Sequence, residues 1–389
     1  MLAALAHRGP DGSGTHIAGE VGIAHNRLAI IDLATGDQPI HAGSAAIVAN
    51  GEVYNYLELR DAHALSCATG SDCEPPLHLY RRHGVPGFAA ELRGMYAAAL
   101  HDRAARKLVL TRDPFGIKPL YLANIANGIA FASEPQALLA AGLVQPRIRR
   151  EARDELLQMQ FTTGAETIFE GITRLLPGET VVITDGAITE RHRRPALPEG
   201  GPEPITESDA LARLDRAFED SVRLHQRSDV PYGLFLSGGI DSGAVLAMMA
   251  RLNDRPVRAY TAVFDAPGAV DERAAAEAAA RAAGAIHATV PVTEAEVWRH
   301  LPRIVAALDD PAADYAIIPS WFLARRAREE VKVVLSGEGG DEIFGGYGRY
   351  RSAMRPWWLG GKRPRATGTF DHVPDVLREA PRLWRDGLG

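Results

Sequence analysis

Short apolar runs separated by turn signals fill the first half of the chain. Strand-like runs occur at residues 21–32, 45–53, 95–102, 107–111, 120–123, 129–133 and 180–191. The dipeptides Asn127-Gly128 and Asp185-Gly186 favour tight hairpin turns, and short helices are predicted over residues 72–82 and 134–141. Many short strands joined by hairpins predict an α+β domain of antiparallel sheets with helices over residues 1–195.

Strand–helix alternation replaces the hairpins beyond a proline-rich connector at residues 196–206, which has no hydrophobic period. Strands are predicted over residues 232–236, 257–264, 286–292 and 331–335, and helices over residues 210–224, 242–251, 271–283, 294–308 and 320–330. Thr293 and Glu296 have the spacing of a helix capping box. The alternation predicts an α/β domain over residues 207–389, with a doubly wound parallel sheet that binds ligands at the carboxyl ends of its strands.

Composition narrows the class of protein. The chain is 46% hydrophobic and 24% charged, and its net charge of −6 argues against a nucleic-acid-binding surface. The two cysteines, Cys67 and Cys73, imply no disulfide framework and fit a reducing compartment. No apolar run reaches the ~20 residues of a membrane span, and no signal peptide opens the chain. We therefore expect a cytoplasmic protein with small-molecule substrates and neither nucleic-acid nor membrane partners; a homodimer is compatible with the sequence.

The segment Ser237-Gly238-Gly239-Ile240-Asp241-Ser242 joins an apolar strand to an Ala- and Met-rich helix. A Gly-rich turn that enters a helix points free backbone N–H groups at one spot, where the helix dipole favours a phosphate. The two serines add hydroxyl donors, and Asp241 can hold a magnesium ion that bridges phosphate oxygens. The segment is not a Walker A loop, since no Gly-Lys-Ser or Gly-Lys-Thr occurs in the chain. The alternative is an ordinary strand–helix turn.

Further polar clusters lie at predicted strand ends and helix starts. The loop Ser336-Gly337-Glu338-Gly339-Gly340-Asp341 follows a β-branched strand, and its glycines and acids disfavour the alternative of a flexible acidic surface loop. In the first half, the clusters are Arg27, Asn50-Gly51-Glu52 and Ser71-Asp72. Taken singly, these three are typical of a solvated arginine, a turn and a helix N-cap. Asp271-Glu272-Arg273 and Asp309-Asp310-Pro311 read equally well as solvated helix ends or as parts of a site.

Taken together with His7-Arg8-Gly9-Pro10-Asp11 and residues 112–121, these motifs resemble the glutaminase domain of amidotransferases that use an N-terminal nucleophile. The loop from Ser237 to Ser242 resembles the pyrophosphate-binding loop of enzymes that cleave ATP between the α and β phosphates. The loop that begins at Ser336 resembles the second nucleotide motif of asparagine synthetases, in which Ser or Ala is more usual at the position of Gly340. In this order, and over essentially the whole chain, the motifs resemble the glutamine-hydrolysing asparagine synthetases.

The resemblance implies an N-terminal-nucleophile hydrolase fold followed by an adenine-nucleotide α-hydrolase fold. It implies the ATP- and Mg²⁺-dependent amidation of aspartate to asparagine through β-aspartyl-AMP, with nitrogen from glutamine or ammonia. It assigns glutamine binding to Arg27, Asn50, Gly51, Glu52 and Asp72; ATP binding to Leu236, Ser237, Gly238, Gly239, Asp241, Ser242, Ala262, Ser336 and Gly337; magnesium to Asp241 and Asp341; and catalysis to Glu338. The residue types fit, because zwitterionic glutamine needs a cation and carboxylates, and an oxyanion needs donors such as the Asn50 amide and the Gly51 N–H.

One departure from the family's pattern concerns the nucleophile. The family's nucleophilic cysteine precedes the His-Arg-Gly-Pro-Asp motif, which here begins at His7. Neither Cys67 nor Cys73 can replace it, because neither carries a free N-terminal amine. We expect a fragment that is truncated at both ends, a sequence whose start is assigned too late, or a protein that uses free ammonia. Two alternatives stay open: a relative that amidates another carboxylate, and an inactive nucleotide-binding relative. No role is predicted for residues 365–389.

Overall fold

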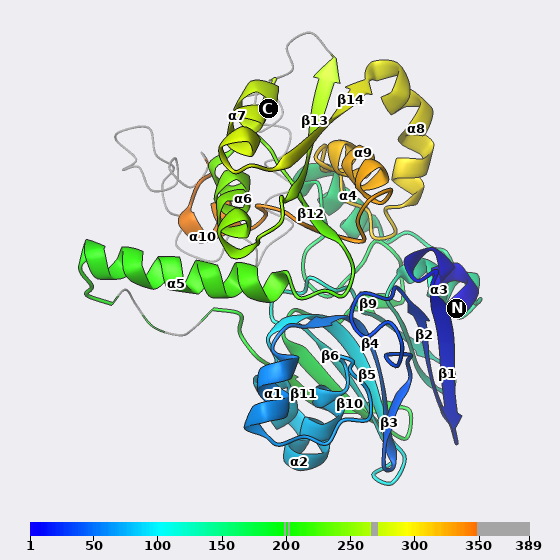
Figure 1. Cartoon of the computed structure of the whole chain (residues 1–389). Coiled ribbons are helices and arrows are strands. Elements are labelled where there is room, and N and C mark those ends of the chain that lie inside the picture. Colours follow the sequence, from blue (N-terminus) through cyan, green and yellow to red (C-terminus); the bar gives the residue numbers. More distant parts are fainter. Residues whose placement is uncertain (198–199, 201–202, 266–270, 348–389) are drawn as a thin grey trace.

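The computed structural model describes residues 1–197, 200, 203–265 and 271–347 (Figure 1). Part of the predicted connector and residues 365–389 lie outside the described residues. In the described part of the chain, no helix has the length and apolar character that crossing a membrane requires.

The first half forms layers of helices and antiparallel sheets. Its strands are β1 Gly12–Ala18, β2 Val21–Arg27, β3 Ile40–Ala42, β4 Ala45–Val53, β5 Gly94–Asp102, β6 Lys107–Arg112, β7 Tyr121–Ile125, β8 Gly128–Ala132, β9 Ile172–Arg174, β10 Glu179–Thr184 and β11 Ala187–Arg193. Its helices are η1 Leu2–Arg8, α1 Tyr56–Ala62, α2 Pro75–Ala90, α3 Pro135–Ala140 and α4 Arg150–Met159. A six-stranded sheet of order β11-β10-β6-β5-β4-β3 is accompanied by the sheets β1-β2 and β8-β7-β9.

Strand β4 shows how the layers arise. Successive strand side chains point to opposite faces, so both faces of a central strand are apolar when both are covered. Ile47 and Ala49 pack with Leu77 of α2, whereas Ala46 and Val48 pack with Leu122 of β7. The six-stranded sheet therefore has helices on one face and the smaller sheets on the other. The predicted α+β organisation with antiparallel sheets is observed.

Several predicted boundaries are wrong. The run 21–32 leaves the strand after Arg27, and the helix predicted from residue 72 begins at Pro75. The run 180–191 is divided into β10 and β11, and the predicted hairpin turn at Asp185-Gly186 is confirmed. Strands β1, β3 and β9 and helices α1 and α4 were not predicted. β3 and β9 have only three residues each, and β1 is glycine-rich, so local pattern is weak there.

The second half is a parallel sheet with helices on both faces (Figure 1). Its elements are α5 Glu207–His225, β12 Tyr232–Phe235, α6 Ile240–Leu252, β13 Arg258–Asp265, α7 Arg273–Ala282, β14 Ile286–Thr293, α8 Glu294–Ala306, α9 Ile317–Ala327, β15 Val333–Leu335 and α10 Gly340–Phe344. Ala259 packs with Met249 of α6 on one face, and the neighbouring Tyr260 packs with Ala327 of α9 on the other. The prediction of a doubly wound sheet is confirmed.

Strand order places the candidate site. The order is β14-β13-β12-β15, so the chain proceeds from β12 to one side and later returns to the other. The carboxyl ends of β12 and β15 therefore meet at a topological switch point, where ligands bind in open α/β sheets. The capping box of Thr293 and Glu296 is confirmed, whereas α5 is capped by Thr206 and begins before Ser208.

Candidate functional site

Hydrogen bonds of Ser237 and Ser242 fix the conformation of the loop after β12. The Ser242 hydroxyl accepts the Ser237 N–H at 3.1 Å, and the two hydroxyl oxygens lie 2.9 Å apart. The Ser237 hydroxyl also accepts the Gly239 N–H at 3.2 Å. Ser237, Gly238 and Gly239 are exposed, and Gly239 is the N-cap of α6. The first-turn N–H groups of α6 therefore lie at this loop, and a helix N-terminus is the backbone arrangement that an anion site requires.

The loop after β15 packs directly against the first turn of α6. A Cβ atom on Gly337 would lie 2.6 Å from the Ser242 backbone nitrogen. A Cβ atom on Gly340 would lie 2.5 Å from the carboxylate carbon of Asp241. The glycines therefore allow an approach that a larger residue would obstruct, and the two loops that the sequence singled out form one site. The glycine at 340 leaves room for the Asp241 carboxylate.

Two carboxylates of the type that binds Mg²⁺ border these loops. Asp241 lies in the first turn of α6, and Asp341 lies in the first turn of α10, next to Gly340. Carboxylate oxygens are the ligands that Mg²⁺ prefers, usually in combination with substrate phosphates. Ser336 and Glu338 are exposed on the same loop, and the Ser336 hydroxyl accepts the Glu338 N–H at 3.5 Å.

Leu236 and Ala262, near which the resemblance places the adenine of ATP, are already engaged in the sheet. The Leu236 N–H donates to the Tyr260 carbonyl at 2.9 Å, and the Leu236 carbonyl accepts the Thr261 hydroxyl at 2.7 Å. Ala262 pairs with Val290 between β13 and β14. An adenine contact to Leu236 would therefore use the second lone pair of its carbonyl oxygen.

The two ambiguous acidic clusters lie in different places. The Glu272 carboxylate accepts the Gly238 N–H at 3.1 Å, so it lies against the loop after β12. Asp310 instead joins the two halves of the chain: it accepts from the Tyr121 hydroxyl at 2.7 Å and from Arg174 at 2.6 and 2.9 Å. Asp309 accepts the Gln136 N–H at 3.0 Å. These acids therefore serve the interface between the halves.

The second candidate site lies at the end of β4. Gly51 has φ +141°, and a Cβ atom there would lie 1.9 Å from the Met95 carbonyl oxygen, so the position requires glycine. The side-chain nitrogen of Asn50 and one carboxylate oxygen of Glu52 are buried and have no hydrogen-bond partner among the residues that the structure describes. Because buried polar groups are nearly always paired, these two atoms indicate a polar ligand.

Arg27 and Asp72 are linked to this strand end through neighbouring loops. The buried Arg27 guanidinium donates to Asp37 at 2.8 Å and to the Asp32 carbonyl at 2.5 Å. The Asp32 carboxylate in turn accepts the Gly70 N–H at 2.7 Å, close to Asp72 in the chain. Asp72 accepts the Val53 N–H at 2.8 Å. The structure therefore connects the predicted cation and carboxylates in one region.

Burial dominates the electrostatics of this region. It raises the pKa of Glu52 to about 7, with a further contribution from the charge of Asp72 that Lys118 partly offsets. Burial also raises the pKa of Asp72 to about 6 and lowers that of the Lys118 ammonium. Two carboxylates that resist ionisation favour a cationic ligand group. Burial raises the pKa of the Cys73 thiol, which disfavours the nucleophilic thiolate.

Two residues of these sites were not predicted, Asp32 and Lys118, and Glu272 was predicted only as an equal alternative to a solvated helix end. Lys118 stands inside the motif that begins at Arg112, so its position was a usable signal. Asp32 accepts a hydrogen bond from Gly70, which lies 38 positions further along the chain. Glu272 accepts one from Gly238, which lies 34 positions earlier. No local sequence pattern reveals contacts of this separation.

The two sites are joined by direct contacts. The Asp229 N–H donates to the Ile30 carbonyl at 3.0 Å, and the Asp229 carboxylate accepts the Asp32 N–H at 2.7 Å. Asp11 accepts the Ala29 N–H at 2.8 Å and the Lys332 ammonium at 2.9 Å, and these bonds lower the Asp11 pKa. The loop that Arg27 holds therefore contacts the segments that lead into β12 and β15.

Known proteins resemble both halves. Residues 1–193 match the family model described as a glutamine amidotransferase domain, and residues 213–386 match the model described as asparagine synthase. A putative glutamine-hydrolyzing asparagine synthetase of Mycobacterium tuberculosis is 41% identical over 97% of this chain and 59% of its own. Glutamine-hydrolyzing asparagine synthetase 1 of Bacillus subtilis is 37% identical over 97% of this chain and 58% of its own. Putative glutamine-hydrolyzing asparagine synthetase 2 of Methanocaldococcus jannaschii is 30% identical over 91% of this chain and 73% of its own. The chain thus spans about three fifths of the length of the first two relatives.

Proposed function

The chain belongs to the family of glutamine-hydrolysing asparagine synthetases, and from this premise we propose that it activates aspartate with ATP and amidates it to asparagine. The site at the ends of β12 and β15 would carry out the synthetase chemistry. The site at the end of β4 would bind glutamine. The contact of Gly337 and Gly340 with the first turn of α6 carries this proposal, because it unites both predicted ATP loops.

In the first step, a β-carboxylate oxygen of aspartate attacks the α-phosphorus of ATP. A new O–P bond forms, the bond to the bridging oxygen breaks, and pyrophosphate leaves. The N–H groups of Gly238 and Gly239, with the hydroxyls of Ser237 and Ser242, would hold the phosphate oxygens. The Gly239 N–H would exchange its bond to the Ser237 hydroxyl for one to phosphate. Asp241 and Asp341 would hold Mg²⁺, which supplies neutralisation of the pyrophosphate charge. The Gly238 N–H must exchange the Glu272 carboxylate for phosphate when ATP binds.

In the second step, ammonia attacks the activated carbonyl, and AMP leaves with the bonding electrons. The nitrogen must lose a proton as the amide forms. Glu338 is exposed on the loop after β15 and can accept that proton. Ammonia would come from glutamine or from solution.

In the glutamine site, Arg27 would pair with the α-carboxylate, and Glu52 and Asp72 would pair with the α-ammonium group. The unpaired Asn50 amide nitrogen and the Gly51 N–H would donate to the side-chain carbonyl. Ionised forms of Glu52 and Asp72 are needed for this pairing. Their raised pKa values therefore couple glutamine binding to proton release.

The proposal is tested by measuring AMP and pyrophosphate from ATP, Mg²⁺ and aspartate, with ammonium in one reaction and glutamine in another. We expect equal amounts of both products that depend on aspartate and ammonium. If both products form with another carboxylic acid but not with aspartate, that acid is the acceptor, and the proposed cleavage of ATP still holds. ADP and phosphate in place of AMP and pyrophosphate would contradict the proposed cleavage.

A further inference from the structure

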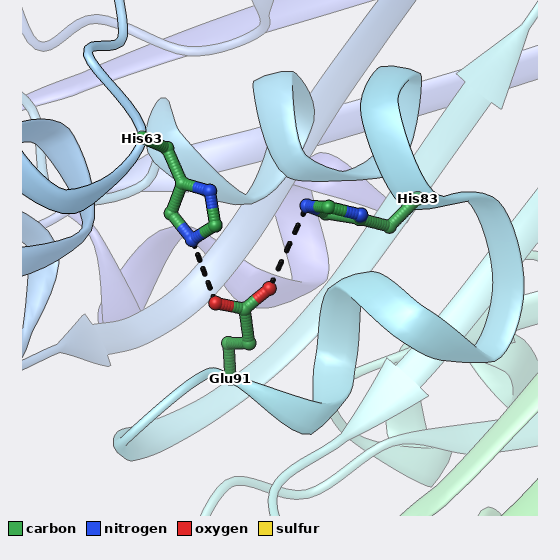
Figure 2. Close-up of side chains that lie close together, drawn as sticks. All are labelled: His63, His83 and Glu91. Atoms are coloured by element: carbon green, nitrogen blue, oxygen red, sulfur yellow. Dashed lines mark hydrogen bonds and ion pairs between the residues drawn. The ribbon is translucent and has the colours of Figure 1, made fainter.

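Two histidines and one glutamate converge outside both sites. Figure 2 shows the rings of His63 and His83 on either side of the Glu91 carboxylate, with a nitrogen of each ring directed at it. The Nε2 atom of His63 lies 2.6 Å from one carboxylate oxygen, and the Nε2 atom of His83 lies 3.7 Å from the other. One ligand atom from each residue lies within 4.8 Å of the other two.

The local backbone brings these residues together. His63 is the C-cap of α1, and Glu91 is the C-cap of α2. Helix α2 is interrupted directly after His83, because Gly84 has φ +63° and Val85 is extended. An unbroken helix would place His83 and Glu91 more than two turns apart, at about 1.5 Å per residue. The interruption folds them toward one point.

The ligand positions are fixed by hydrogen bonds that involve the backbone. The Asn55 side chain donates to the Glu91 carbonyl at 2.9 Å. Arg194 donates to the carbonyls of the residues on either side of Glu91, at 2.8 Å to Ala90 and 3.3 Å to Leu92. The His63 N–H donates to the Leu59 carbonyl at 3.1 Å. Anchored backbone lowers the cost of ordering a ligand set.

We propose that His63, His83 and Glu91 bind a divalent transition-metal ion of the zinc type, with a fourth position open to solvent. Two imidazoles and a carboxylate form one of the ligand sets of three-ligand zinc sites. Metal–ligand bonds of about 2.0–2.1 Å in a tetrahedron separate ligand atoms by about 3.3 Å. The observed separations of 2.6 and 3.7 Å lie on either side of that value, so small side-chain shifts suffice.

Arg82 contacts the ring of His63 and competes with a metal ion for it. Its guanidinium lies 3.3 Å from Nδ1 of His63 and donates to the His63 carbonyl at 3.0 Å. When Nε2 of a neutral imidazole binds a metal, the proton resides on Nδ1, which then faces another donor. Metal binding therefore displaces Arg82 from the ring. The substitution Arg82→Gln removes this competition and the nearby positive charge.

A second group, Cys67, Glu74 and His78, has similar separations. It is the weaker candidate, because both oxygens of Glu74 are already used. They accept from the Ala68 N–H at 2.7 Å, from the N–H and hydroxyl of Thr69 at 2.7 and 2.6 Å, and from His78 at 3.1 Å. This carboxylate holds the preceding loop and would lose those bonds on turning to a metal.

The test is a zinc titration of the whole chain against a chromogenic chelator, with cobalt absorption spectra to report the ligands. We expect one zinc ion per chain. His83→Gln and Glu91→Gln should each weaken binding at least about tenfold, because even outer-shell changes cost about 10–100-fold. Arg82→Gln should tighten binding. His192→Gln, a surface histidine elsewhere, and Cys67→Ser should leave it unchanged.

Circular dichroism of each variant separates loss of the site from loss of the fold. Absence of zinc binding by the folded wild-type chain overturns the proposal. So does equal affinity of the wild-type, His83→Gln and Glu91→Gln chains. A thiolate-to-cobalt charge-transfer band that disappears in Cys67→Ser assigns the metal to the second group and also overturns it.

Discussion

Asp241→Asn should reduce aspartate-dependent pyrophosphate release at least about 100-fold, while the chain stays folded. The neutral amide is a poor Mg²⁺ ligand, and the charge stabilisation by a catalytic metal is worth several kcal/mol, at about 1.4 kcal/mol per tenfold in rate. The structural cost is small, because Asn has nearly the same shape as Asp, and the charge of Asp241 in the first turn of α6 is worth about 0.3–1 kcal/mol. Steady-state pyrophosphate assays and tryptophan fluorescence measure the two effects.

Asp254→Asn is the matched control. Asp254 is an exposed aspartate just beyond the opposite end of α6, so the same chemical change there should leave turnover unaltered. Tryptophan fluorescence suits this comparison, because all five tryptophans lie beyond residue 297, in the same half of the chain as Asp241 and Asp254. Pyrophosphate release that survives in Asp241→Asn would remove Asp241 from the metal site.

Glu52→Gln should stabilise the first half of the chain at pH 8 and weaken glutamine binding. The folded pKa of Glu52 is raised from 4.5 to about 7, so its stabilising contribution is present below pH 4.5 and is lost as pH rises through 7. At pH 8 the buried ionised carboxylate costs about 3 kcal/mol, at about 1.4 kcal/mol per pKa unit, and at pH 5 the cost is below about 1 kcal/mol. Hydrogen exchange of the β4 amides measures the gain in stability of the variant, which should be larger at pH 8 than at pH 5.

Calorimetric titration with glutamine measures the expected loss of glutamine binding in Glu52→Gln. The variant should bind at least about tenfold more weakly, because a charge-assisted hydrogen bond worth about 1.5–3 kcal/mol is lost. Glu20→Gln, in the exposed β1–β2 turn, should change neither stability nor binding. Destabilisation by Glu52→Gln at pH 8 would contradict the sign of the raised pKa.

The parallel sheet was predictable because its elements are long enough to show their periods. The predicted runs 257–264, 286–292 and 294–308 lie within two residues of β13, β14 and α8. The three-residue strands β3 and β9 and the glycine-rich β1 carry no such pattern, so only tertiary pairing reveals them. The helix predicted over residues 72–82 ends close to the interruption of α2 at Gly84, whereas the second segment of α2, up to Ala90, was not predicted.

The candidate sites were predictable where chemistry is encoded in contiguous residues. The two glycine-rich loops are such segments, and the switch point between β12 and β15 explains why they meet. Their partners were not predictable. The contact of Glu272 with Gly238, the pairing of Asp310 with Arg174, and the approach of His63 to Glu91 join residues far apart in the chain.

The central proposal is that the site between β12 and β15 joins AMP to the aspartate side chain. Aspartate labelled with oxygen-18 in its β-carboxylate tests it most directly, with Mg²⁺, ATP and ammonium present. If the β-carboxylate attacks the α-phosphorus, one labelled oxygen remains on the phosphate when ammonia displaces AMP. Mass spectrometry should therefore find AMP that carries oxygen-18 in proportion to the asparagine formed. Unlabelled AMP, or label in inorganic phosphate, would contradict adenylation at this site.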